Sequence, residues 1–138
     1  MNLKKYLLAV VAVFVAYSGL GYLIHEVLLD ADYQPMVGSV LRGVEEFGRR
    51  LPFLYLGNLV FALAFCLIYV KGYEPRKNWI GQGLRFGLFM ALLLAPLALT
   101  SYVVYPVTGA LAVKWVIFGS LQILITSLVV AGLYQTQA

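Results

Sequence analysis

Four ionisable side chains lie inside long apolar stretches of this 138-residue chain: His25, Glu26, Arg85 and Lys114. On insertion scales, a charged residue at the centre of a membrane helix costs about 2.5–3.5 kcal/mol, so such a residue is a candidate functional residue. His25 and Glu26 are neighbours, and a histidine beside a carboxylate can bind or relay a proton. A ligand or proton site is therefore the first chemistry that these residues suggest.

Further polar side chains accompany His25 on one side of a predicted helix. At 3.6 residues per turn, Ser18, Tyr22, His25 and Glu26 share one arc. Lys114 lies in another apolar stretch at a similar predicted depth, and we expect it to pair with Glu26. The alternative is that Lys114 snorkels outward while Glu26 bonds to His25, Tyr22 or the outer loop. The predicted site comprises His25, Glu26, Lys114, Tyr22, Ser18 and Gln122.

Other polar groups are predicted to serve the fold. Asn58, Gln122 and Thr126 fall in the middle of apolar stretches, where hydrogen bonds between helices are typically worth about 1 kcal/mol or less. If they line a cavity with His25, they become part of a cargo or proton path. Arg85, with Gln82 nearby, is expected to snorkel to cytoplasmic phosphates.

Several membrane chemistries need residues that this chain lacks. The single cysteine, Cys66, excludes an internal disulfide and a thiol pair, and we interpret it as a packing residue. The single histidine excludes a bis-histidine haem within one chain, so haem bound through His25 at a dimer interface is the remaining cofactor option. No zinc-ligand cluster, phosphate-binding loop or hydrolase motif occurs. We therefore predict no metal, no resident cofactor and no enzymatic activity.

The elements that position these residues are four apolar stretches, at about 6–29, 51–70, 79–105 and 107–134. Each is long enough to cross a hydrocarbon core about 30 Å thick as a helix. Only 12% of residues are charged, about half the share in soluble domains. We predict an all-α integral membrane four-helix bundle, a single four-span domain over residues 1–138. The first stretch is too long for a signal peptide and is expected to be an uncleaved span.

The connection between the first two spans is amphipathic. Over about residues 36–50, apolar side chains fall on one helical face and charged ones on the other, with Glu45–Arg49 and Glu46–Arg50 spaced four apart. We predict a short interfacial helix here. A solvated connector and a lid or partner-docking element are the alternatives.

A stripe of small residues follows one side of the third span: Gly83, Gly87, Ala91 and Ala95. Because small residues let helix backbones approach closely in lipid, this stripe is predicted to pack against a neighbouring helix. The neighbour is either another span of the bundle or a second copy of the chain. Pro96, deeper in the same span, is expected to kink the helix.

Basic residues near the span ends predict the orientation. Lys4 and Lys5 precede the first span, and Lys71, Arg76 and Lys77 lie in the short connection between the second and third. Since Lys and Arg are enriched in cytoplasmic loops, we place both termini in the cytoplasm, in what we expect to be a bacterial inner membrane. The net charge of +4 then reflects topology and lipid headgroups rather than nucleic acid.

A four-span chain with a lone glutamate in its first span, Glu26, resembles the small multidrug-resistance transporters, which use such a glutamate to exchange protons for cations. This chain is longer, places its glutamate nearer the span end and has the amphipathic connection, so no family is assigned. We expect a small non-enzymatic scaffold or accessory subunit of a membrane complex. The alternative is a transporter or hydrophobic-ligand binder with a polar cavity around Glu26, His25 and Lys114. The expected partners are membrane lipid and a homo-oligomer or larger membrane complex.

Overall fold

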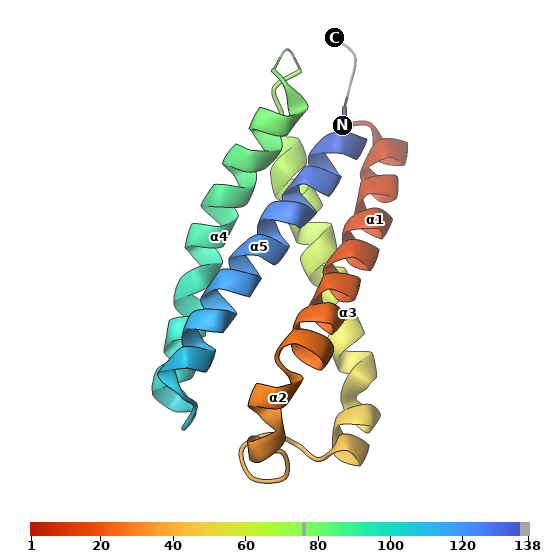
Figure 1. The fold of residues 1–138 in the computed structure, drawn as a ribbon. Coiled ribbons are helices and arrows are strands. Elements are labelled where there is room, and N and C mark those ends of the chain that lie inside the picture. The colour runs from red at the N-terminus through yellow and green to blue at the C-terminus, as the bar shows by residue number, and fades with distance from the viewer. Residues whose placement is uncertain (76, 136–138) are drawn as a thin grey trace.

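The computed structural model describes residues 1–75 and 77–135, and four long helices make up most of them (Figure 1). Each of the four is long and apolar enough to cross a membrane. The helices are α1 (Leu3–Tyr22), α3 (Val44–Lys71), α4 (Trp79–Val104) and α5 (Gly109–Leu133). No strand forms in the described part of the chain, so the predicted all-α four-helix bundle is confirmed.

Three of these helices begin at side-chain caps. The Asn2 side chain accepts a hydrogen bond from Lys5 N, Asn78 accepts from Ile80 N and Gly81 N, and Thr108 accepts from Leu111 N. Such caps satisfy backbone N–H groups that have no partner within the helix. The polar residue before each apolar run therefore sets where the helix starts.

The segment after α1 contains three short elements. A π-helical turn (Leu23–Leu28) extends α1 and is followed by α2 (Asp30–Tyr33) and a 3-10 turn (Gln34–Met36). The π-helical turn ends in a hydrogen bond of 2.9 Å from Leu29 N to Ile24 O. Leu29 is fully buried here, against Ile24 and Leu111, and this contact fixes where α2 folds back toward α5.

The predicted separate interfacial helix at 36–50 is wrong, because residues 37–43 form a turn. Gly38 adopts a φ of +82°, and its N–H donates to Leu41 O at 2.8 Å. Helix α3 then begins at Val44 and continues without a break through the second span. Its 28 residues make it about 42 Å long at 1.5 Å per residue, more than the 30 Å core requires. The amphipathic residues are thus the first turns of a long membrane helix.

Helices α4 and α5 pack most closely, through the predicted small-residue stripe. A Cβ added at Gly83 would lie 2.9 Å from Ala131 Cβ, and one at Gly87 would lie 3.0 Å from Leu124 Cδ2 and clash with Ser127 Oγ. Ala91 is buried on the same face, whereas Ala95 lines a cleft described below. In this structure the stripe meets α5, a helix of the same chain.

Helix α1 packs against both α3 and α5, whereas α3 and α4 meet near one end. There, Phe86 of α4 lies 4.7 Å from Phe65 and 5.3 Å from Tyr69 of α3, measured between ring centroids. Toward the end that carries α2, the two helices diverge (Figure 1). We call this the α2 end and the opposite one the termini end, because α1 begins and α5 finishes there.

Candidate functional site

Side chains from three elements meet at the α2 end. The Tyr33 hydroxyl lies 2.7 Å from His25 Nδ1 and 2.7 Å from Trp115 Nε1. Because an indole N–H can only donate, Tyr33 Oη accepts from Trp115, and its own hydrogen is free to bond to His25 Nδ1. This arrangement suits a neutral imidazole with its proton on Nε2. Burial, the largest influence, raises the pKa of Tyr33 above its usual 10.0, so its hydroxyl stays protonated at neutral pH.

Lys114, next to Trp115, pairs with Asp32 instead of with Glu26 as predicted. Lys114 Nζ lies 2.9 and 2.7 Å from the two carboxylate oxygens of Asp32. Glu26 is exposed and makes no hydrogen bond or ion pair to the residues that the structure describes. The prediction failed because α2 folds back under α5 and brings Asp32 to the lysine. The spacing of residues along the sequence does not predict the turn that leads into α2.

The remaining predicted site residues lie elsewhere. Ser18 Oγ accepts a hydrogen bond of 3.1 Å from Asn58 Nδ2, which links α1 to α3. Gln122 Nε2 donates to Tyr17 O at 2.8 Å, which links α5 to α1. Tyr22 is exposed. The structure therefore bonds His25 and Lys114 to two adjacent residues, Tyr33 and Asp32. It places Ser18 and Gln122 deeper in the bundle. It was Tyr33 and Asp32 that sequence reasoning did not assign to the site.

A cleft of about 250 Å³ lies between Phe61 of α3 and the facing residues of α4 and α5, on the side where α3 and α4 diverge (Figure 1). Its lining includes Tyr17 of α1, Phe61 of α3, Ala95 of α4, and Trp115 and Gln122 of α5. His25, Glu26 and Lys114 do not line it. The cleft extends from Gln122 to Trp115, whose indole N–H is already bonded to Tyr33.

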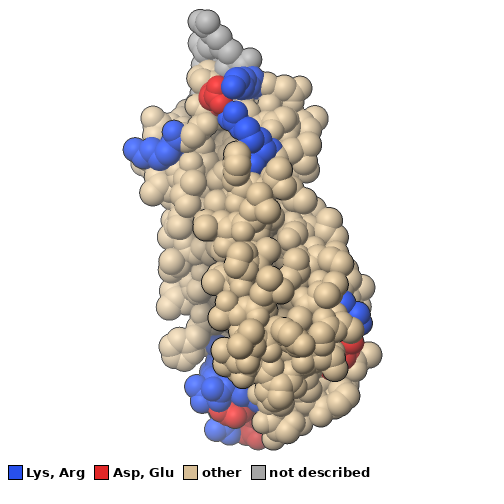
Figure 2. Space-filling view, turned by 90° about the vertical axis from the view of Figure 1, so that its left-hand side faces the viewer, with Lys and Arg blue, Asp and Glu red and all other residues tan. Residues whose placement is uncertain are grey.

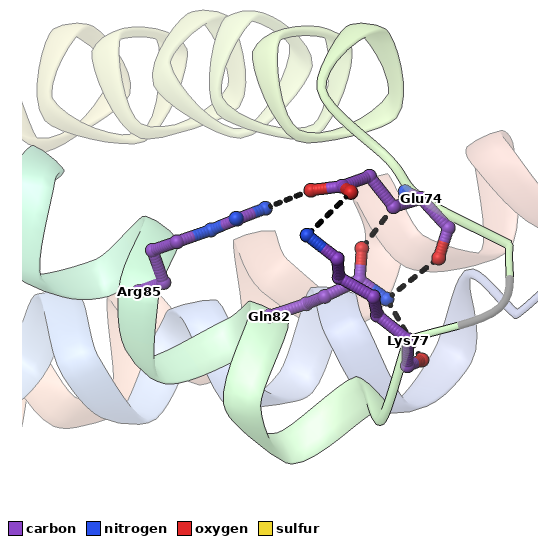
Figure 3. Close-up of polar contacts among 4 residues, drawn as sticks. All are labelled: Glu74, Lys77, Gln82 and Arg85. Atoms are coloured by element: carbon purple, nitrogen blue, oxygen red, sulfur yellow. Dashed lines mark hydrogen bonds and ion pairs between the residues drawn. The ribbon is translucent and has the colours of Figure 1, made fainter.

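A third polar cluster fastens the loop between α3 and α4 at the termini end (Figure 3). Glu74 lies 2.6 Å from Lys77 Nζ and 2.5 Å from an Arg85 guanidinium nitrogen. Gln82 is buried and accepts from Glu74 N at 2.9 Å, while its Nε2 donates to the carbonyls of Glu74 and Lys77, both at 3.0 Å. Arg85 and Gln82, expected to reach lipid phosphates, thus bond to the loop.

The charges of this protein gather at its two ends. On the face in Figure 2, blue and red side chains mark both ends, and an almost uncharged band separates them. Within residues 1–75 and 77–135, no group of three or more His, Cys, Asp or Glu side chains could hold a metal ion. Fold and contacts together define a small four-span membrane protein. Neither its sequence nor its fold matches a family model, a curated protein or a solved structure.

Proposed function

We propose that this protein is a non-enzymatic membrane subunit that serves as a scaffold or accessory for another membrane-spanning chain. The observation that carries the proposal is the exposure of α3 at the α2 end. From Pro52 to Val60 every residue except Asn58 is exposed. Asn58 bonds to Ser18 and Tyr55 contacts Phe14, both of α1, but most of the surface of this half of the helix is uncovered. A helix from a partner chain would cover this surface.

The surface of α3 also suits close approach of a helix backbone. A Cβ added at Gly57 would meet nothing within 4 Å, so this glycine is not required for packing inside the chain. Glycines on membrane helices commonly mark points where two helices touch. Two of the three side chains considered for transport, His25 and Lys114, are bonded to Tyr33 and Asp32 instead of lining a cavity.

The test is the size of the protein in mild detergent after extraction from its own membrane. Native mass spectrometry of the wild type should show a complex of fixed stoichiometry with a second membrane chain, either another protein or a further copy. Gly57→Leu should release the chain from that complex. Gly19→Leu is the matched control, because Gly19 is also exposed with nothing within 4 Å of an added Cβ. A wild type that is monomeric under these conditions would refute the proposal.

A further inference from the structure

The cleft between α3 and α4 has one polar wall deep in the bundle. Gln122 stands near the middle of α5, only 7% exposed, and its side chain lines the cleft. Because Tyr17 O can only accept, the bond at 2.8 Å requires the Gln122 amide nitrogen to face α1. Gln122 Oε1 then accepts no hydrogen bond from the described residues and is free to accept one from a molecule in the cleft.

Beside Gln122, the lining is apolar and in part aromatic. Tyr17 and Phe61 stack with ring centroids 4.3 Å apart, and Trp115 lies farther along the cleft. Ser120 is a second polar residue of the lining on the α5 side. The volume of about 250 Å³ is below the roughly 300–1,000 Å³ of sites that enclose drug-sized ligands. The cleft therefore has room for one ring or one short chain rather than a whole lipid.

We propose that this cleft binds an apolar molecule carrying a hydroxyl group, which donates its hydrogen to Gln122 Oε1 while its ring or chain packs against Tyr17, Phe61 and Trp115. A hydroxyl satisfies the lone amide oxygen, and the remaining lining accepts apolar atoms. Entry is from the lipid, through the gap between α3 and α4. This inference is independent of the scaffold role, because the partner surface on α3 and the cleft are tested by different variants.

Trp115 makes the binding measurable. The chain has two tryptophans, so in a Trp79→Phe background Trp115 alone reports on the cleft. The probes are 4-bromophenol and 4-bromotoluene, which differ only by hydroxyl against methyl and quench tryptophan through bromine. We expect saturable quenching by both, with bromophenol binding more tightly.

Two variants in that background separate recognition from occupancy. Gln122→Leu should weaken bromophenol binding by about three- to tenfold, the loss of one hydrogen bond within the membrane, and leave bromotoluene unchanged. Gly119→Leu should abolish saturable quenching by both probes, since Gly119 lines the cleft and an added Cβ there meets only open space. Asn58→Leu, which removes an amide that does not line the cleft, and Gly19→Leu should both bind like the background protein.

Three results would overturn the proposal. Quenching that never saturates would mean that the probes only dissolve in the detergent. Saturable quenching that survives Gly119→Leu would place the binding elsewhere. Equal bromophenol affinity with and without the Gln122 amide would show an apolar cleft that does not recognise a hydroxyl. If Gln122→Leu loses its helical circular dichroism, Gln122→Met replaces it, because it keeps the length of the side chain without the amide.

Discussion

At the residue scale, Tyr33 of α2 bonds to two other elements, whereas each site residue predicted from the sequence bonds to one at most. Its hydroxyl joins His25 of the π-helical turn to Trp115 of α5, and its ring stacks on His25 with centroids 5.9 Å apart. The neighbouring Asp32 binds Lys114. Together these contacts hold the segment after α1 against the start of α5, so the polar residues of the α2 end stabilise the fold.

We predict that Tyr33→Phe lowers the free energy of unfolding by about 1–2 kcal/mol, because the indole N–H and the imidazole each lose a partner. Unfolding in mixed detergent micelles, followed by circular dichroism, measures the change. Tyr22→Phe is the control, since the exposed Tyr22 side chain makes no hydrogen bond to a described residue, and it should leave stability unaltered. An equal effect of the two substitutions would contradict the role assigned to Tyr33.

The candidate residues show how far the sequence reaches at this scale. The cost of burying charge in lipid correctly drew attention to His25 and Lys114. Their partners could not be predicted, because Asp32 and Tyr33 arrive through a turn that Leu29 anchors by burial. The same limit applies to Glu74, whose bond to Arg85 joins residues eleven positions apart across a loop.

At the element scale, hydropathy and length predicted the four helices well, and small residues predicted one contact surface. The first turns of α3 were misplaced because an amphipathic pattern has the same period whether a helix lies on the membrane or extends out of it. The gap between α3 and α4 could not be predicted from the sequence either. Both helices are apolar on most sides, and lipid competes with protein for such surfaces.

The contact between α4 and α5 should be sensitive to a single methyl group. We expect Gly87→Ala to destabilise the protein by about 1–3 kcal/mol, because the added Cβ overlaps Ser127 and crowds Leu124. The same detergent unfolding assay applies. Gly57→Ala, where the methyl group meets nothing within 4 Å, is the matched control. Adding Ser127→Ala to Gly87→Ala should restore part of the lost stability. If Gly87→Ala is as stable as wild type and Ser127→Ala has no effect on it, the α4–α5 contact does not pass through Gly87.

The loop between α3 and α4 should respond to acid. Hydrogen bonds from Lys77 and then Arg85 hold the pKa of Glu74 below its usual 4.5. A carboxylate with a lowered pKa in the folded state stabilises the fold above its unfolded pKa, and this contribution is lost as pH falls through the folded pKa. We therefore expect wild type to exceed Glu74→Gln in stability at pH 7 and the difference to fade below about pH 4.5. A difference that stays constant down to pH 3 would disprove the assignment.

At the scale of the whole molecule, the two ends differ in how their charges are paired. At the α2 end, Arg49 pairs with Glu45 and Arg50 with Glu46. At the termini end, Lys4 and Lys71 have no acidic partner among the described residues, and Glu74 is the one acidic residue of the loop there. The first residues of the chain are tied to those that follow α5, since Asn2 N donates to Tyr134 Oη at 3.1 Å and Lys5 Nζ donates to Gln135 O.

The Lys and Arg residues close to the span ends, rather than their pairing, lead to a prediction about orientation. Because Lys and Arg close to span ends resist translocation, we expect the termini end to stay in the cytoplasm. A reporter that works only in the cytoplasm should be active when fused at residue 1 and at residue 138. A reporter that works only after export should be active when inserted in the turn at residue 40. Replacing Lys4, Lys5, Lys71 and Lys77 with glutamine should produce a mixture of orientations, whereas Arg49→Gln with Arg50→Gln should not. Opposite locations for the two termini would contradict an even number of crossings, and with it the four-span bundle on which the contact at Tyr33 and the cleft beside Gln122 both depend.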